Sequence, residues 1–511
     1  MANWSAGYAA DVDYTFGYFK ELNPLTLKLA LIDAGIAPPD ISTACELGFG
    51  QGVSINIHAA GSATKWYGTD FSPTQAGFAQ QLAQASDNQA HLFDQAFTDF
   101  VKREDLPDFD FICLHGIWSW ISDENRSLLV DFIARKLKVG GALFISYNGP
   151  AGWANMIPIR HLLNQYAEHM APKGTSAIEK VQSAFSFAEK LIAMNPGFLQ
   201  ANPQALKSFN VVKNQDPIYL AHEYFSADWK PMPFSDMAAW LAPSKCDYVC
   251  SAHSLDEVNA INLTEAEEAL INQQTNPIFR ETIRDLCMNQ QFRRDIWVKG
   301  PRKLDQFEQM EQLMELRLVL IQLRSEVELS VNGMLGPLKL KAETYSPILD
   351  FFADYRVKTI GELLSAMQTF DIPFEKIMQA IMVLTGKNTL ALAQDPMQIE
   401  QARHKTTKLN QFILKKARAS DSLLTLASPV TGGGIEPQGY EMLFMLAMQF
   451  GHSTPETIAK FVWGLLKQRG IRLYHQGQAL ETDADNLDAL QQQVAFFLGE
   501  PAQLYQALGI I

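Results

Sequence analysis

The chain has 511 residues, of which 47% are hydrophobic and 19% charged, and its formal net charge is −14. This length suits roughly two to four domains, and the acidic balance argues against general nucleic-acid binding, which needs a basic surface. The apolar stretches are shorter than the ~18 to 20 residues of a membrane-spanning helix, and the five cysteines follow no disulfide pattern. Because the N-terminus also shows no signal-peptide pattern, a cytoplasmic protein without a membrane span is expected.

Short apolar runs alternate with helical stretches along the first 150 residues, after a predicted helix at 20–35. The expected strands cover 43–47, 65–69, 90–93, 109–115 and 142–147, and the expected helices cover 52–60, 73–85, 97–102 and 123–138. Such alternation predicts a parallel sheet with helices on both faces. Ligands of these sheets bind at the carboxyl ends of the strands.

After residue 147 the regular alternation stops. Residues 151–230 are expected to be mainly helical, 247–252 and 293–300 to be strands, and 264–290 to be helical; the strand at 293–300 could return to the sheet edge. Cys246 and Cys250 are expected on or beside a buried strand, because no partners for a zinc site accompany them. We therefore predict an α/β domain at 1–300, with 151–230 as a helical elaboration within it.

Residues 301–511 are predicted to form a mainly helical, winged-helix-like domain. Helices are expected over 305–324 and near 346–354, 359–368, 373–384, 439–450 and 455–469, with a hairpin whose turn is Asn332-Gly333. The glycine-rich segment 426–437 is expected to be a connector, and the basic segment 403–418 a solvated helix face. Met-rich helices at 307–323 and 442–448 could pair with a second copy as a homodimer, although core packing is the default.

The segment "ELGFGQG" at 46–52 follows a predicted strand and opens a helix. Its glycines, Gly48, Gly50 and Gly52, predict a backbone that bends sharply and is approached closely by a ligand. Asp70 ends the next strand, 20 residues beyond Gly50 (70 minus 50), where a carboxylate can accept hydrogen bonds from ribose hydroxyls. NAD and S-adenosylmethionine both fit these features.

Three further features separate the two cofactors. The spacing G-x-G-x-G differs from the G-x-G-x-x-G of dinucleotide sites. Glu46 would repel a pyrophosphate, but its carboxylate suits a cofactor that carries an ammonium and a sulfonium. Asp94 and Phe97 follow the third strand, where they offer a carboxylate to the adenine amino group and a wall to the crevice. Together these features predict an S-adenosylmethionine site, with S-adenosylhomocysteine as the product.

The first 150 residues resemble class I S-adenosylmethionine-dependent methyltransferases. A narrower resemblance, to methyltransferases that carry a regulatory domain, covers most of the chain. The segments that carry it are "YTFGYFKELNP", "CLHGIWSWIS", "SYNGPAGW" with "PIRHLL", "LAHEYF" and "FRRDIWVKG". That subgroup includes the rickettsial-type outer-membrane-protein lysine methyltransferases. The resemblance implies a Rossmann-like sheet, a regulatory region at 218–300 and a lysine side chain of a protein as the methyl acceptor. One departure is the inserted residue in Pro150-Ala151-Gly152-Trp153, where the family has Pro-Gly-Trp.

The predicted site residues gather at the ends of the expected strands. His115 ends the fourth strand as a base or only a cofactor contact, and Asn148 and Tyr147 end the fifth as acceptor-pocket residues. His222 and Glu223 either reach the substrate mouth or pack between domains, and no metal site is predicted because a second histidine at ligand spacing is missing. The predicted cofactor contacts are Tyr18, Glu46, Gly48, Gly50, Gly52, Asp70, Phe71, Asp94, Ala96, Phe97 and His115. The predicted acceptor contacts are Tyr14, Trp118, Trp120 and His222, of which the aromatic residues form either a wall that favours cations or ordinary core.

The favoured function is a methyltransferase that acts on lysine side chains of a protein substrate. The motifs themselves do not name the acceptor, so a small metabolite is the alternative within the same chemistry. A non-catalytic alternative is a protein that senses S-adenosylmethionine with its first domain and acts through its C-terminal helices. Neither nucleic acid nor a metal ion is expected as a partner.

Overall fold

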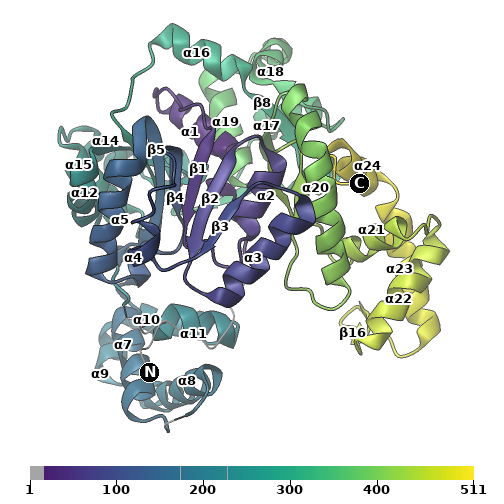
Figure 1. Ribbon diagram of the computed structural model, residues 1–511, viewed down its shortest axis with the longest axis horizontal. Helices are drawn as coiled ribbons and strands as arrows, with labels where there is room; N and C mark the ends of the chain where they lie inside the picture. Colours follow the sequence, from purple (N-terminus) through teal and green to yellow (C-terminus); the bar gives the residue numbers. More distant parts are fainter. Residues whose placement is uncertain (1–15, 173, 227) are drawn as a thin grey trace.

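A seven-stranded sheet forms the centre of the molecule (Figure 1). The computed structural model describes residues 16–172, 174–226 and 228–511. The strands are β1 (Thr43–Leu47), β2 (Lys65–Asp70), β3 (His91–Asp94), β4 (Phe109–Leu114), β5 (Leu137–Asn148), β6 (Cys246–Ser251) and β7 (Phe292–Lys299). Their order is β3-β2-β1-β4-β5-β7-β6; β1 to β5 are parallel, and β7 is antiparallel to both of its neighbours. The predicted α/β class and Rossmann-like sheet are confirmed.

Strand β7 lies beside β5, inside the sheet. The predicted strand does return to the sheet, where it pairs with β5, but the edge position is taken by β6. The burial of Cys246 at 6% and Cys250 at 6% on β6 agrees with the predicted buried strand, and all five cysteines are free thiols.

Helices cover both faces of the sheet and make a separate core on each. The helices of the first half are α1 (Pro24–Asp33), α2 (Val53–Gly61), α3 (Pro73–Ser86), α4 (Phe97–Phe100), α5 (Asp123–Lys136) and α12 (Phe234–Leu241). Strand β4 contributes Ile112 and Leu114 to the core under α5 and α12, and Phe111 and Cys113 to the core under α1, α2 and α3. A strand that is buried on both faces reads as a continuous apolar run, which is why the sequence pattern locates it well.

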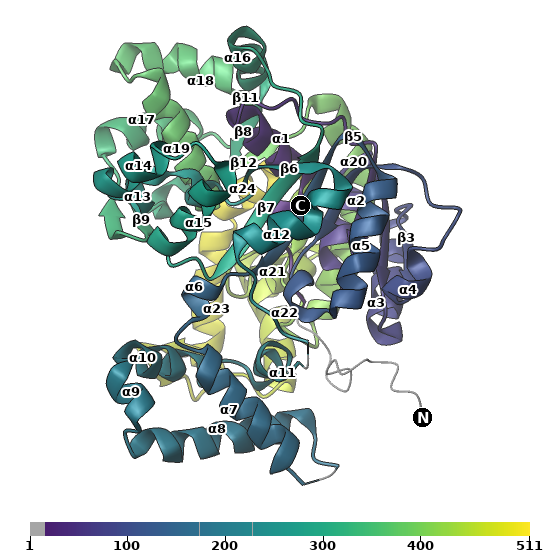
Figure 2. The same cartoon turned by 90° about the vertical axis from the view of Figure 1, so that its left-hand side faces the viewer.

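A helical lobe, residues 150–225, lies beneath the carboxyl ends of the parallel strands (Figures 1 and 2). Its helices are α6 (Pro150–Trp153), α7 (Ile157–His169), α8 (Ala177–Ala193), α9 (Gly197–Ala201), α10 (Pro203–Val212) and α11 (Pro217–Phe225). The lobe has a hydrophobic core of its own, centred on Leu163, Ala184 and Phe209. Three more helices, α13 (Asn259–Asn262), α14 (Glu265–Asn272) and α15 (Pro277–Cys287), connect β6 to β7.

The chain beyond residue 300 is largely helical, as predicted. Its helices are α16 (Gln306–Glu315), α17 (Ala342–Phe351), α18 (Ile360–Met367), α19 (Phe374–Gly386), α20 (Pro396–Ala417), α21 (Glu441–Gln449), α22 (Pro455–Gln468), α23 (Asp483–Phe497) and α24 (Glu500–Ala507). Its strands are β8 (Arg317–Leu320), β9 (Ser330–Gly333), β10 (Gly336–Lys339), β11 (Lys358–Thr359), β12 (Leu390–Ala393), β13 (Leu426–Ser428), β14 (Gly433–Ile435), β15 (Tyr474–His475) and β16 (Gln478–Ala479). Strand β8 is the centre of a three-stranded sheet with β11 and β12.

Three predictions for this region are corrected. The helix expected over 305–324 ends at Glu315, and the buried run that follows it is β8, because a short apolar run does not reveal its period. The predicted hairpin exists, but Gly333 pairs with Gly336, so Met334 and Leu335 form the turn in place of Asn332-Gly333. The glycine-rich segment is a buried hairpin, β13–β14, packed against α2.

One core cluster contains residues from both sides of Gly300. It includes Ile32, Val53 and Ile57 from the first half of the chain together with many residues beyond 313. The division of the chain near Gly300 therefore stays a prediction. Among the described residues, no helix combines the length and apolar character needed to cross a membrane.

Candidate active site

The glycine loop joins the end of β1 to the start of α2 and adopts the conformation that its sequence predicts. Gly48, Gly50 and Gly52 have φ values of 77°, 56° and 69°, in the left-handed region that favours glycine. A Cβ atom at Gly52 would lie 2.4 Å from the Cβ of Ala79 on α3. The Gly48 N–H donates to the carbonyl oxygen of Thr69 over 2.8 Å, so the loop is tied to the neighbouring strand β2.

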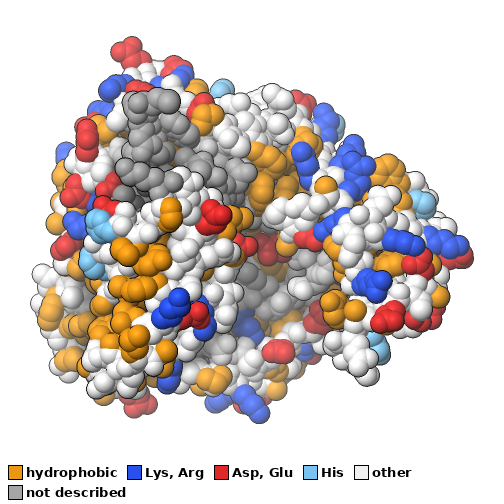
Figure 3. Space-filling model, turned by 90° about the horizontal axis from the view of Figure 1, so that it is seen from below, with side chains coloured by type: hydrophobic (Ala, Val, Ile, Leu, Met, Phe, Trp, Pro, Cys, Tyr) orange, Lys and Arg blue, Asp and Glu red, His pale blue; other side chains and the backbone are white. Residues whose placement is uncertain are grey.

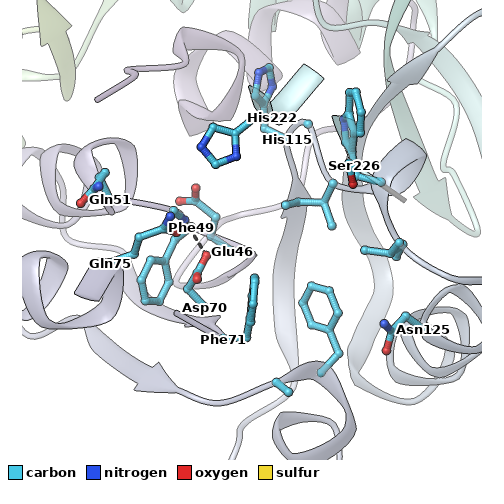
Figure 4. Close-up of a pocket in the computed structure, with 18 of the residues that line it drawn as sticks. Glu46, Phe49, Gln51, Asp70, Phe71, Gln75, His115, Asn125, His222 and Ser226 are labelled. Carbon is cyan, nitrogen blue, oxygen red and sulfur yellow. Dashed lines mark hydrogen bonds between the residues drawn. The ribbon is translucent and has the colours of Figure 1, made fainter. Parts of the chain in front are cut away.

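A cavity opens where this loop, the ends of β2, β3 and β4, and helix α11 come together (Figure 4). The residues that line it are Gly17, Phe19, Glu46, Gly48, Phe49, Gly50, Gln51, Gly52, Asp70, Phe71, Gln75, Gln95, Ala96, Phe97, His115, Gly116, Ile117, Trp120, Ile121, Ser122, Asn125, His222, Glu223, Ser226 and Asp228. It therefore lies at the carboxyl ends of the parallel strands, where binding was predicted.

Glu46 is a buried carboxylate on the wall of this cavity. Its side chain is 3% exposed, and its Oε2 atom has no hydrogen-bond partner among the described residues. Burial, followed by the nearby charge of Asp70, raises the pKa of Glu46 to about 8. A buried acceptor atom without a partner is costly, so this carboxylate is suited to a cationic ligand that supplies the missing donor.

Asp70 ends β2 and holds the glycine loop in place. Its Oδ2 accepts from the Gly50 N–H and its Oδ1 from the Ser72 N–H, each over 2.9 Å. Burial raises the pKa of Asp70 to about 6, although these two hydrogen bonds lower it. Each carboxylate oxygen can accept a further hydrogen bond, so this side chain can also serve ribose hydroxyls, as predicted.

His115 follows β4 and faces the cavity. Its ring stacks on Phe19 with the centroids 3.7 Å apart, and it lies against Phe144 and Phe292 on β5 and β7. Burial lowers the pKa of His115 to about 4, so the imidazole is neutral at pH 7. An imidazole with so low a pKa is a weak acceptor for the proton of an ammonium group, which favours the alternative of a cofactor contact.

Most of the predicted site residues come together at this cavity. Those that line it are Glu46, Gly48, Gly50, Gly52, Asp70, Phe71, Ala96, Phe97, His115, Trp120 and His222. Tyr14 lies outside the described residues. The remaining predicted residues, Tyr18, Asp94, Trp118, Tyr147 and Asn148, lie beside the cavity or behind its wall and do not line it.

Four of these five residues make specific contacts away from the cavity lining, and the fifth, Asp94, is exposed to solvent. Tyr18 packs on Gly434 of β14 and lies near His58. Trp118 is fully buried against Trp240 and Met232, and the Tyr147 hydroxyl donates to Asp295 over 2.7 Å.

Asp94 is exposed at the end of β3, opposite Asp70, and the next residues, Gln95 and Ala96, line the cavity. Asn148 is buried, and its backbone N–H donates to Ser119 Oγ. Tyr147 and Asn148 are consecutive residues of β5, so their side chains point to opposite faces of the sheet.

Some lining residues were not predicted, among them Phe19, Gln51, Gln75, Gln95 and Asn125. Gln51 lies within the glycine loop and Gln75 in the first turn of α3 after Asp70, so proximity to the motif residues was an available signal. Asn125 and the residues after α11 reach the cavity through tertiary packing, for which no local pattern exists.

Comparisons with known proteins agree on the class of this fold. A family model described as a methyltransferase domain matches residues 45–145, and one described as a predicted methyltransferase regulatory domain matches residues 216–299. An uncharacterized protein of Synechocystis, sll1526, is 35% identical over 512 residues, which cover 99% of each chain. An uncharacterized Rickettsia prowazekii protein, RP028, is 29% identical over 138 residues, 26% of this chain and 54% of that one. The structure of PKMT2 from Rickettsia typhi in complex with AdoHcy has a TM-score of 0.70 at 16% identity, covering 97% of this chain and 99% of the other.

The fold and these matches define an S-adenosylmethionine-dependent methyltransferase of class I. The chain belongs to the methyltransferases that carry a methyltransferase regulatory domain. The residues at the cavity fit the cofactor, because Glu46 has an unpartnered buried oxygen and the glycine loop leaves its backbone accessible. When bound, S-adenosylmethionine supplies an electrophilic methyl group on a positively charged sulfur. In the described ranges, no group of three or more His, Cys, Asp or Glu side chains is arranged to hold a metal ion.

Proposed function

We propose that this methyltransferase transfers methyl groups to lysine side chains of a protein substrate. The observation that carries the proposal is the charge of the cavity. Four acidic side chains, Glu46, Asp70, Glu223 and Asp228, line it, and its described lining contains no lysine or arginine. Such a lining attracts a cationic acceptor and disfavours an anionic one such as a phosphate or a carboxylic acid.

The aromatic residues of the cavity support the same acceptor. Phe19, Phe71, Phe97 and Trp120 line it, and aromatic faces attract both ammonium and sulfonium groups. The protein has to align a nitrogen lone pair with the methyl carbon, so proximity and the exclusion of water are the main contributions to catalysis that this reaction needs. The lysine must lose a proton first, because an ammonium has no lone pair.

A protein acceptor is supported by the outer surface of the helical lobe. Six large apolar side chains of this lobe are at least 37% exposed: Ile157, Met170, Phe187, Met194, Leu206 and Val211. Figure 3 shows apolar side chains gathered on the lobe, beside the hollow that separates it from the C-terminal helices. Exposed apolar patches typically contact another protein. The whole-chain likeness in fold to PKMT2, a protein lysine methyltransferase, also supports this proposal.

The test is transfer of a methyl label from S-adenosylmethionine to a bacterial lysate and, separately, to poly-L-lysine. We expect macromolecular label that is recovered as methyl-lysine after acid hydrolysis. Label that appears only in small molecules would replace the proposal with a metabolite methyltransferase. Label in protein that is recovered on another residue type would keep the protein acceptor and reject lysine.

A further inference from the structure

Helix α11 brings a carboxylate to the side of the cavity that the glycine loop does not occupy. Glu223 lines the cavity together with His222 on the same helix. Glu46 and Asp70 are placed by β1 and β2 on the cofactor side, so Glu223 and Asp228 are the carboxylates left for the acceptor. Asp228 is exposed, whereas Glu223 is half-buried. A half-buried carboxylate interacts with a charged ligand more strongly than one in open solvent.

The backbone at Glu223 is held in position by hydrogen bonds from Arg160. Arg160 on α7 donates from Nε to the carbonyl oxygen of Glu223 over 3.3 Å and from Nη2 to that of Ser226 over 3.0 Å. The Arg160 guanidinium lies 4.2 Å from the ring centre of Trp229. These contacts fix the end of α11 against α7 and leave the Glu223 side chain without a salt bridge to any described lysine, arginine or histidine.

His115 and Tyr147, the two other residues considered as proton acceptors on this side of the cavity, are less suited to receive a proton from an amine. His115 has a pKa of about 4, and Tyr147 is buried, bonded to Asp295 and outside the lining. Burial raises the pKa of Glu223 to about 7, although Arg160 lowers it. The Glu223 carboxylate is therefore a better acceptor for the proton than the His115 imidazole. The charged and titratable groups around Glu223 are Arg160 on α7 and Tyr219, His222 and Tyr224 on α11.

We propose that Glu223 binds the acceptor ammonium and accepts one of its protons. An N–H bond of the ammonium breaks, its electron pair stays on nitrogen as the lone pair, and the proton forms an O–H bond with the Glu223 carboxylate. The neutral amine then attacks the methyl carbon: an N–C bond forms, the C–S bond of the co-substrate breaks, and its electron pair goes to sulfur to give S-adenosylhomocysteine. Glu223 returns its proton to solvent. This inference rests on the proposed function, since it requires an amine as the acceptor.

The test compares the wild type with Glu223→Gln, which keeps the side-chain volume and removes the charge. We expect the wild-type kcat/KM for poly-L-lysine to rise with pH on a limb near pH 7, because Glu223 must be ionised. In Glu223→Gln that limb disappears and kcat/KM falls by about a hundredfold, which is the usual scale of general-base catalysis. The Kd of S-adenosylhomocysteine, measured by calorimetry, should change less than twofold. Glu168→Gln, the same change on an exposed residue of α7, is the matched control and should have no effect.

A second readout does not depend on turnover. Binding of n-butylamine, which mimics the end of a lysine side chain, to the S-adenosylhomocysteine complex at pH 7 should release protons, because burial raises the pKa of Glu223 to about 7 and a bound cation favours the ionised carboxylate. Calorimetry in two buffers with different ionisation enthalpies measures this release, and Glu223→Gln should abolish it. Glu223→Asp keeps a carboxylate and should restore the pH limb with a lower rate.

The outcomes distinguish this inference from the function on which it rests. Wild-type transfer to lysine, with an unchanged rate and pH limb in Glu223→Gln, would overturn the role of Glu223 and leave the lysine acceptor standing. A wild-type enzyme that labels no amine would overturn both. If Glu223→Gln loses S-adenosylhomocysteine binding as well, Glu223 supports the cofactor side, and the inference is again wrong.

Discussion

The two sides of the cavity are constructed differently. On the cofactor side, the backbone of residues 48–52 and the carboxylates of Glu46 and Asp70 follow directly from the ends of β1 and β2. On the side proposed for the acceptor, which is called the acceptor side below, His222 and Glu223 come from the helical lobe, more than 70 residues beyond the end of β5 at Asn148 (222 minus 148 is 74). One side is thus set by local backbone geometry, and the other by the docking of a lobe that has its own core.

This difference predicts separate consequences for substitutions. A change on the cofactor side should alter the affinity for S-adenosylhomocysteine directly, because the binding surface is the backbone itself. A change on the acceptor side should alter the kinetics with the methyl acceptor and leave cofactor affinity nearly constant. A lobe that is anchored by a few contacts can also differ between related enzymes without loss of the sheet or the glycine loop.

The largest expected effect is that of Gly52→Ala. The new Cβ would lie 2.4 Å from the Cβ of Ala79, and an alanine at a φ of 69° costs about 1–2 kcal/mol. We expect the affinity for S-adenosylhomocysteine to fall at least thirtyfold, about 2 kcal/mol, as measured by calorimetry. The matched control is Gly77→Ala on α3, where a Cβ meets no atom within 4 Å. That change should leave the affinity for S-adenosylhomocysteine unchanged and raise the free energy of unfolding by about 0.5–1 kcal/mol. A similar loss of affinity in Gly77→Ala would contradict the argument.

The same contrast explains what could be predicted from the sequence. Strands β1 to β4 were located within about one residue because their apolar runs end in glycine, aspartate or histidine, and the predicted cofactor contacts were chosen from those ends. Trp118 and Tyr147 were harder to assign, because an aromatic residue near a strand end can face the cavity or the core. Residues 317–320 show a related limit of prediction from the sequence. They are the central strand of a sheet because they pair with β11 and β12, which lie far away in the sequence.

Asp70→Asn should produce the next largest effect. The carboxylate accepts from both the Gly50 and the Ser72 N–H groups, and an asparagine would turn its amide donor toward one of them. A hydrogen bond to a charged group contributes about 1.5–3 kcal/mol, so we expect cofactor affinity to fall about tenfold to a hundredfold. Asp99→Asn, at an exposed position of α4, is the control. Calorimetry on both variants, together with Asp94→Asn, would also test the predicted adenine contact.

The pH dependence of cofactor binding should report on Glu46. The pKa of this carboxyl is about 8 in the free protein, and a bound cation lowers it, so binding expels a proton at neutral pH. Affinity for S-adenosylhomocysteine, whose α-amino group is cationic, should therefore rise as the pH increases toward 8, by up to tenfold per pH unit. Glu46→Gln should bind more weakly and lose this slope. A slope that persists in Glu46→Gln would assign the titration to another group.

Arg160→Lys should have the smallest effect, and it tests the acceptor side alone. Lysine keeps the positive charge, but it cannot reproduce the planar fork that donates to the carbonyls of Glu223 and Ser226 while lying on Trp229. The end of α11 should loosen, so we expect the KM for the methyl acceptor to rise about threefold to tenfold and amide hydrogen exchange in α11 to accelerate. Arg135→Lys, within an exposed pair with Asp131 on α5, should change neither. The Kd of S-adenosylhomocysteine should stay within twofold of the wild type; a parallel loss of cofactor affinity would mean that the lobe also shapes the cofactor side, and that the two sides of the cavity are not independent.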